Sequence, residues 1–109
     1  MNCYKYGVGM YMKLENKKVN SKKLYSIGYC GNLNKYILEC VVPGSVWYNR
    51  YYEISEEEFV KYDTNSYELD ALVDSIRNNS YNSDIFLFSD MMRENTKEQA
   101  ELKEIALEH

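Results

Sequence analysis

Hydrophobic and polar residues alternate with a period of two along much of the first half of the chain. The alternation is clearest in residues 3–15, and it returns in residues 24–30, 35–42 and 46–54. Because successive side chains of a strand point to opposite faces of a sheet, each of these segments predicts a β-strand. The polar segment between the first two, residues 16–23, predicts a hairpin loop. Consecutive strands joined by short turns favour an antiparallel sheet.

The second half of the chain shows signals for helices. Ser55 and Glu58 form the S-x-x-E pattern of a capping box, which predicts a helix over residues 56–62. Ser66 can cap a second helix that ends near residue 78 and carries one apolar stripe at helical spacing. The stripe consists of Leu69, Leu72, Val73 and Ile76.

The end of the chain predicts one extended segment and one more helix. Residues 85–88 are an apolar run that we expect to be extended. Thr96 and Gln99 form another capping box, for a helix over residues 97–106. Together these patterns predict an α+β domain, with a four-stranded antiparallel sheet in the N-terminal half and two to three helices packed on one face.

The length and the C-terminus limit the domain organisation and the possible chemistry. A chain of 109 residues has the size of one domain. Residues 107–109 resemble the start of a cloning scar and a histidine tag, so we assign residues 1–106 to a single domain and 107–109 to an expression-tag remnant. His109 is the only histidine. The domain therefore offers no imidazole as a general base, as a partner for a serine or cysteine nucleophile, or as a zinc ligand.

The cysteines and the hydropathy indicate the compartment. Cys3, Cys30 and Cys40 lie far apart, form no CxxC pair and follow no apolar leader. We therefore expect reduced thiols in a cytoplasmic protein. No apolar run approaches the ~18 residues that a membrane-spanning helix needs. The sequence contains no motif that indicates a cofactor or a metal ion.

Positive and negative residues are distributed unevenly along the chain, although the net charge is only −4. Residues 1–52 contain eight Lys or Arg and two Glu, whereas residues 53–109 contain five Lys or Arg and fifteen Asp or Glu. Two interpretations are open. Either the two halves neutralise each other in the fold, or the acidic half forms a surface that meets a basic partner.

The second interpretation suggests a binding surface of aromatic and acidic residues. Trp47 and Tyr51 are the candidate anchors, provided that they are not in the core, because Trp and Tyr are enriched at binding hot spots. An antiparallel sheet also favours aromatic residues, so the fold alone can explain the twelve tyrosines. The candidate acidic residues are Glu56, Glu57, Asp63, Glu68, Asp70 and Asp74.

Two alternative functions use other residues. A nucleic-acid-binding or regulatory module would use the basic N-terminal half, where four lysines could contact phosphate. These are Lys17, Lys18, Lys22 and Lys23. An enzyme without histidine would need a pocket in which two carboxylates converge. We expect no enzymatic activity, and the acidic half argues against nucleic acid as the partner.

One short segment carries a resemblance to a known family. It follows the pattern R-[YF]-[YF]-x-I-[ST]-x-E-E-[YF] through Arg50, Tyr51, Tyr52, Ile54, Ser55, Glu57, Glu58 and Phe59. This strand-to-helix junction resembles that of small bacterial immunity proteins encoded beside polymorphic or contact-dependent toxins. The resemblance implies a non-enzymatic protein that binds a cognate toxin domain, often a basic nuclease, and blocks its active site. We therefore predict an immunity protein that neutralises a basic toxin domain.

Overall fold

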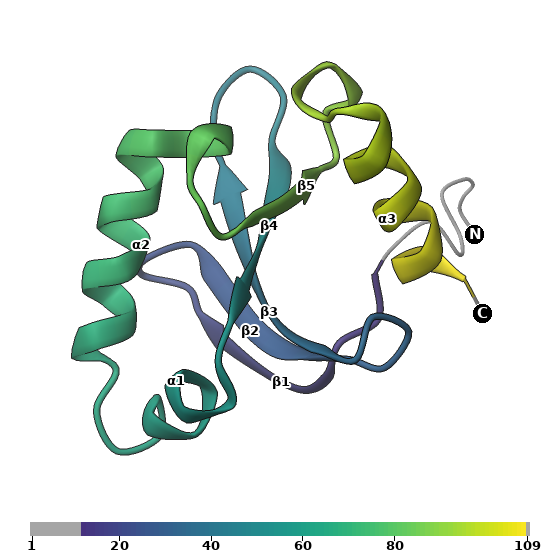
Figure 1. Ribbon diagram of the computed structural model, residues 1–109. Coiled ribbons are helices and arrows are strands. Elements are labelled where there is room, and N and C mark those ends of the chain that lie inside the picture. Colours follow the sequence, from purple (N-terminus) through teal and green to yellow (C-terminus); the bar gives the residue numbers. More distant parts are fainter. Residues whose placement is uncertain (1–11, 109) are drawn as a thin grey trace, which may run out of the picture.

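The computed structural model describes residues 12–108 and contains one β-sheet and three α-helices (Figure 1). The strands are β1 (Glu15–Asn20), β2 (Tyr25–Cys30), β3 (Lys35–Val42), β4 (Tyr48–Ile54) and β5 (Phe86–Ser89). The helices are α1 (Glu56–Lys61), α2 (Tyr67–Asn79) and α3 (Lys97–Leu107), with short 3-10 turns η1 (Ser80–Asn82) and η2 (Met92–Glu94).

The strands form one antiparallel sheet in the order β1-β2-β3-β4-β5. The predicted α+β class and the antiparallel sheet are confirmed. The sheet has five strands instead of four, because the apolar run near residues 85–88, predicted to be extended, returns after α2 to pair with β4. Phe86, Leu87 and Phe88 are all buried in this strand.

The prediction of a hairpin loop over residues 16–23 is wrong. Residues 15–20 form β1, which pairs with β2, and the turn is confined to residues 21–24. The pairing shifts between Glu15 and Lys18, where Asn16 has a positive φ of 54°. Lysines suit a strand at the edge of a sheet, because their charge opposes edge-to-edge association. The polar composition of residues 16–23 therefore reflects the exposure of an edge strand and does not indicate a turn over the whole segment. The predicted strand over residues 3–15 lies mostly outside the described residues.

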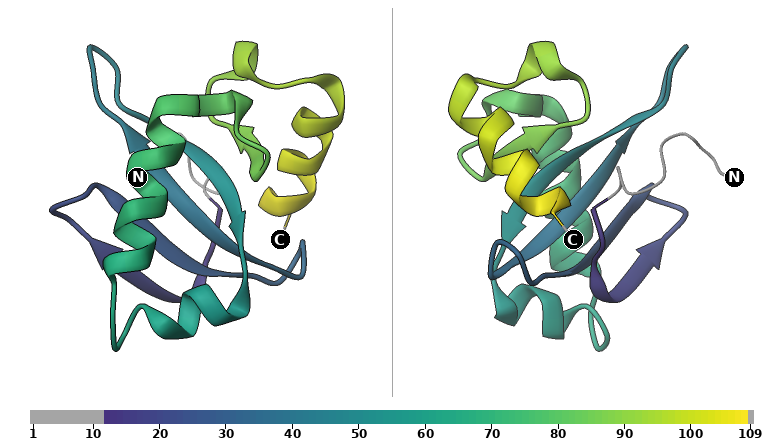
Figure 2. Two further views of the ribbon diagram at one scale, coloured as in Figure 1. Left: turned by 60° about the vertical axis from the view of Figure 1, so that its left-hand side comes forward. Right: turned by 90° about the vertical axis from the view of Figure 1, so that its right-hand side faces the viewer.

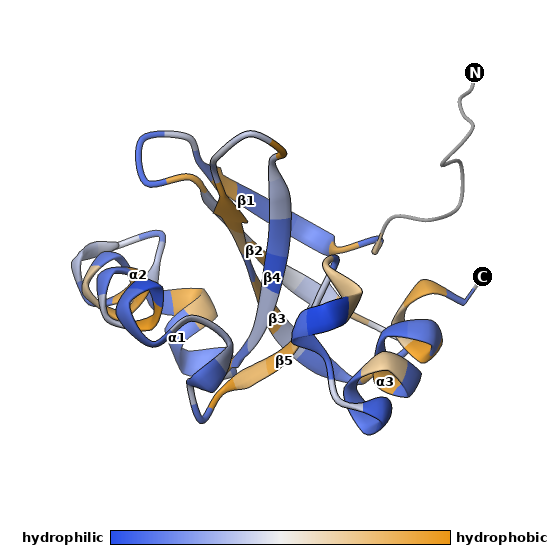
Figure 3. Ribbon diagram, turned by 90° about the horizontal axis from the view of Figure 1, so that it is seen from above, coloured by the Kyte–Doolittle hydropathy of each residue, from blue (hydrophilic) through white to orange (hydrophobic). Residues whose placement is uncertain are grey.

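The helices cover both faces of the sheet, and the prediction that they pack on one face is wrong. Figure 3 shows α1 and α2 on one side and α3 on the other. The reason lies in β3 and β4, where consecutive residues are buried in different clusters. Ile37 and Tyr51 pack with α3, whereas their neighbours Leu38 and Tyr52 pack with α1 and α2. Both faces of these strands are apolar, so both need a cover.

The predicted caps of α1 and α3 are confirmed. The Ser55 hydroxyl accepts from the Glu58 amide, and the Glu58 carboxylate accepts from the Ser55 amide. Thr96 and Gln99 make the same reciprocal pair. Ser66 precedes α2 as predicted, but its side chain makes no capping hydrogen bond. The neighbouring Asn65 side chain accepts from the Tyr67 amide instead.

Gly28 in β2 allows the segment before β1 to lie close to the sheet. A Cβ atom at this position would lie 2.7 Å from the Leu14 Cβ and 3.1 Å from the Glu15 carbonyl oxygen. Such a distance is shorter than any relaxed carbon–carbon contact. The chain can therefore cross β2 here only over a glycine.

We expect Gly28→Ala to lower the free energy of unfolding by about 1–3 kcal/mol, because the added methyl group overpacks the contact with Leu14. Chemical denaturation followed by circular dichroism measures this change. Gly44→Ala is the matched control, since a Cβ at Gly44 meets nothing within 4 Å. Equal stabilities of the two variants would contradict the close approach.

Candidate functional site

The two predicted aromatic anchors have different surroundings. Tyr51 is buried in the cluster beneath α3, with its ring centroid 5.0 Å from that of Phe88. The prediction that Tyr51 anchors a partner is therefore wrong. Trp47 is 61% exposed and lies in the loop between β3 and β4. Trp47 precedes the first residue of β4 and therefore lies outside the part of the sheet that α3 covers.

Trp47 and the acidic start of α1 do not form one surface. The loop that contains Trp47 precedes β4, and α1 follows β4, so the seven residues of β4 separate them. At ~3.3 Å per residue this distance is roughly 20 Å. Both views in Figure 2 show the β3–β4 loop and α1 at opposite ends of the sheet. An aromatic centre with an adjacent acidic rim is therefore not present.

Two of the predicted surface acids form ion pairs with lysines of the N-terminal half. Lys18 Nζ lies 2.9 Å from Asp63 Oδ2 and also donates to the Phe59 carbonyl at 3.1 Å. Lys23 Nζ lies 3.1 Å from Asp74 Oδ1. These contacts support the first interpretation of the charge pattern, in which the two halves neutralise each other.

Asp70 has a structural environment. Its carboxylate accepts a hydrogen bond of 2.7 Å from the Tyr25 hydroxyl and one of 3.2 Å from the Asn20 amide. Burial and the hydrogen bond to Asp70 raise the pKa of Tyr25. Asp70 therefore joins α2 to the first two strands through its Oδ1 atom.

The predicted phosphate-binding lysines are mostly paired as well. Lys17 lies 3.3 Å from Glu39, in addition to the pairs of Lys18 and Lys23. Among residues 12–108, Lys22 is the member of this group without an ion pair. The lysine-rich segment is therefore largely neutralised by carboxylates.

Glu56 and Glu57 are the predicted acids that stay available. Both are exposed in the first turn of α1, and neither forms an ion pair with a Lys or Arg in the described part of the chain. They line a shallow hollow together with Val60, which is 58% exposed, Lys61 and Thr64. We call these five residues the α1 surface. The ammonium group of Lys61 pairs with Glu68 at 2.6 Å, so its charge is partly neutralised by a carboxylate outside the hollow.

A buried ion pair that the sequence did not indicate joins β4 to η2. Arg50 donates from Nε and Nη2 to the two carboxylate oxygens of Glu94, at 2.9 and 2.8 Å. The Tyr48 hydroxyl donates to Glu94 at 2.7 Å. The Glu94 side chain is only 6% exposed. These hydrogen bonds lower the pKa of Glu94 to about 2, and those from Arg50 have the largest effect. Arg50 and Glu94 are 44 residues apart in the sequence, and no local sequence pattern predicts their contact.

A second hollow lies between the sheet and α3, and its lining is mostly polar and charged. Its two apolar side chains are Met12 and Leu107. The polar ones come from β1, β3, β4, the residue after β5, and α3: Lys17, Glu39, Asn49, Tyr51, Asp90 and Lys103. We call it the α3 hollow. Two carboxylates, those of Glu39 and Asp90, line this one cavity. A pocket with two carboxylates is what an enzyme without histidine would need.

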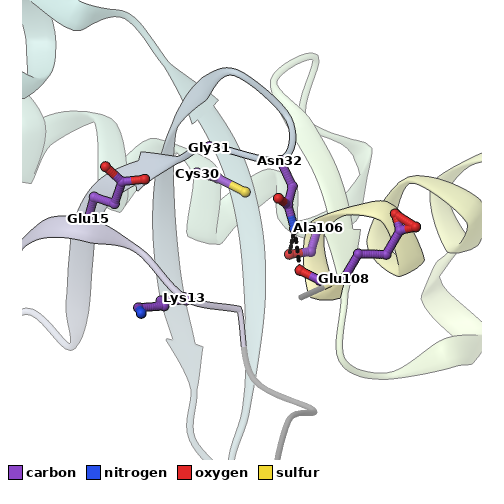
Figure 4. Close-up of a pocket in the computed structure, with 7 residues that line it drawn as sticks. All are labelled: Lys13, Glu15, Cys30, Gly31, Asn32, Ala106 and Glu108. Carbon is purple, nitrogen blue, oxygen red and sulfur yellow. Dashed lines mark hydrogen bonds between the residues drawn. The ribbon is translucent and has the colours of Figure 1, made fainter.

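A third hollow surrounds Cys30 at the end of β2 (Figure 4). The Asn32 side chain donates to the Ala106 carbonyl at 3.3 Å and also to the Glu108 carbonyl, so it caps the C-terminus of α3. Glu108 lies in the segment that we assign to the tag. This hollow is a structural joint between the β2–β3 turn and α3.

Within residues 12–108, no three His, Cys, Asp or Glu side chains are grouped as metal ligands. None of the helices in that range has the length and apolar character to cross a membrane. Comparisons of the chain with protein families, with curated proteins and with solved structures found no match.

We expect acid to destabilise the protein through Glu94. A carboxylate whose pKa is lower in the folded state stabilises the fold above its ordinary pKa, near 4.5 here, and loses this contribution as the pH falls towards about 2. Glu94→Gln should therefore cost about 1–3 kcal/mol at neutral pH and flatten the stability profile between these values.

Urea denaturation at a series of pH values measures this profile. Glu104→Gln is the matched control, because Glu104 is exposed on α3. A control that flattens the profile as much as Glu94→Gln would show that Glu94 is not the responsible group.

Proposed function

We propose that this protein is a non-enzymatic protein-binding module, and that it is an immunity protein that binds and neutralises a basic toxin domain. In this proposal the α1 surface is the docking site. The partner carries Lys or Arg residues that approach Glu56 and Glu57, and an apolar side chain that covers Val60.

The availability of Glu56 and Glu57 carries this proposal. Asp63, Glu68, Asp70 and Asp74 are engaged within the chain, whereas these two carboxylates are exposed and unpaired in the described structure. They flank an exposed apolar residue in a hollow, which combines a charge with a contact area. Both lie in the segment that resembles immunity proteins, Glu57 at a specified position of the pattern and Glu56 at an unspecified one.

The two parts of this surface have separate roles. Exposed carboxylates act over several ångströms and raise the association rate of a basic partner. Burial of Val60 and its neighbours against the partner slows dissociation, because apolar area leaves water only in the complex. Trp47 lies too far away to belong to the same small contact and is a second exposed position.

Two further observations, on the thiols and on the lysines, agree with a cytoplasmic protein-binding module. Cys30 and Cys40 are buried free thiols, which is consistent with the cytoplasmic location that we propose. A nucleic-acid-binding module has weaker support, because Lys17, Lys18 and Lys23 each form an ion pair with a carboxylate.

We expect the double variant Glu56→Gln/Glu57→Gln to lose affinity for the partner by about tenfold and to lose part of the salt dependence of association. Glu58 stays unchanged because its carboxylate belongs to the capping box. The partner to test is the product of the adjacent gene, first for toxicity alone and for rescue by co-expression, and then by titration calorimetry.

Glu101→Gln/Glu104→Gln on α3 is the control, because it removes the same charge from another exposed helix. The control should bind within about twofold of the parent chain. An adjacent gene product that is harmless and does not bind would refute the immunity function. Full affinity in the Glu56 and Glu57 variant would refute the α1 surface alone.

A further inference from the structure

The α3 hollow has a floor of strand residues that share one row of the sheet. Glu39 is paired in register with Ser26 on β2 and with Tyr51 on β4, so the three side chains project from the same face. Ser26 is small, which leaves space above β2. Lys17 uses this space to reach across from β1 towards Glu39.

Two ion pairs are the main charged groups of this hollow. Lys17 Nζ lies 3.3 Å from Glu39, and Lys103 Nζ lies 3.8 Å from Asp90 Oδ1. The Tyr51 hydroxyl lies 3.4 Å from Asp90 Oδ2. Burial and the negative charges of Asp90 and Glu39 raise the pKa of this hydroxyl, so the Tyr51 hydroxyl lies within the electrostatic field of both carboxylates.

The two ion pairs are long for charges that are partly removed from water. A well-formed ammonium–carboxylate hydrogen bond measures about 2.7–2.9 Å, and both distances here exceed this range. The Glu39 and Lys103 side chains are 13% and 17% exposed, whereas their partners Lys17 and Asp90 are 43% and 37% exposed. The hollow thus presents two carboxylates and two ammonium groups that water can reach. A ligand with one positive and one negative group matches both signs of charge.

We propose that the α3 hollow binds a small zwitterion of the α-amino acid class. The ligand ammonium group would lie between the carboxylates of Glu39 and Asp90, and the ligand carboxylate would face Lys17 and Lys103. The apolar part would lie against Met12. The volume of about 460 Å³ is in the range of small-molecule sites.

This proposal is independent of the α1 surface. The α3 hollow lies on the opposite face of the sheet from α1 and α2, and none of its lining residues belongs to the α1 surface. Failure of one proposal therefore leaves the other unchanged.

The test is a titration of the full 109-residue chain with each of the twenty common amino acids, followed by proton–nitrogen NMR. We expect at least one amino acid, at about 10 mM or below, to shift the amide signals of Asn49, Tyr51 and Asp90. The N-acetyl and the carboxamide derivatives of that amino acid each lack one charge. Each should bind about tenfold more weakly or not at all.

Variants of the hollow identify the groups that bind. Glu39→Gln and Asp90→Asn should each weaken the amino acid by about tenfold, whereas Glu104→Gln on the outside of α3 should have no effect. Melting curves verify that each variant is folded.

Three outcomes would overturn the proposal. The first is the absence of any shift at these amides with every amino acid. The second is equal binding of the singly charged derivatives. The third is an affinity equal to that of the parent chain in folded variants of Glu39 and Asp90.

Discussion

The burial of β3 and β4 on both faces is the constraint on which the rest of the structure depends. Ile37 and Leu38 are fully buried although they point in opposite directions. A sheet with two apolar faces cannot leave either one in water, since each large side chain contributes about 1.5–3 kcal/mol on burial. The chain meets this demand with α1 and α2 on one face and with α3 on the other. This arrangement sends the polypeptide around the edge of the sheet, and β5 is the strand that it forms on the way.

The same arrangement determines where the charges meet. The lysines of β1 and the following turn lie beside the acids of the α1–α2 region, so a strong segregation along the sequence becomes a set of ion pairs in space. Each exposed pair contributes only ~0–1 kcal/mol to stability. The ion pairs also reduce the free negative charge, because six of the fifteen acids in residues 53–109 lie beside a Lys or Arg within the described structure. Sequence charge alone therefore overestimates the electrostatic attraction for a basic partner, and Glu56 and Glu57 are the acids for which the sequence argument remains valid.

The sequence predicted those features that depend on neighbours along the chain. Alternation gave β2, β3 and β4, and the reciprocal pairs at Ser55 and Thr96 gave the starts of α1 and α3, because strand and capping patterns span a few residues. Contacts between distant residues were not accessible in this way. Arg50 and Glu94 form their ion pair across 44 positions, and the composition of either segment permits many other partners. Tyr51 shows the same limit, because alternation assigns it to a face of the sheet but does not say that α3 covers that face.

The packing of β4 also bears on whether the two proposed sites influence each other. Tyr51 lines the α3 hollow, the next residue, Tyr52, belongs to the cluster beneath α2, and Ile54 leads into the cap of α1. Coupling between two sites requires an element with two discrete arrangements. β4 is paired with a strand on each side and buried on both faces, so a shift of Tyr51 towards a ligand would disturb two packed clusters at once. The strand is thus a rigid partition, and a ligand in the α3 hollow should leave the geometry of the α1 surface unchanged.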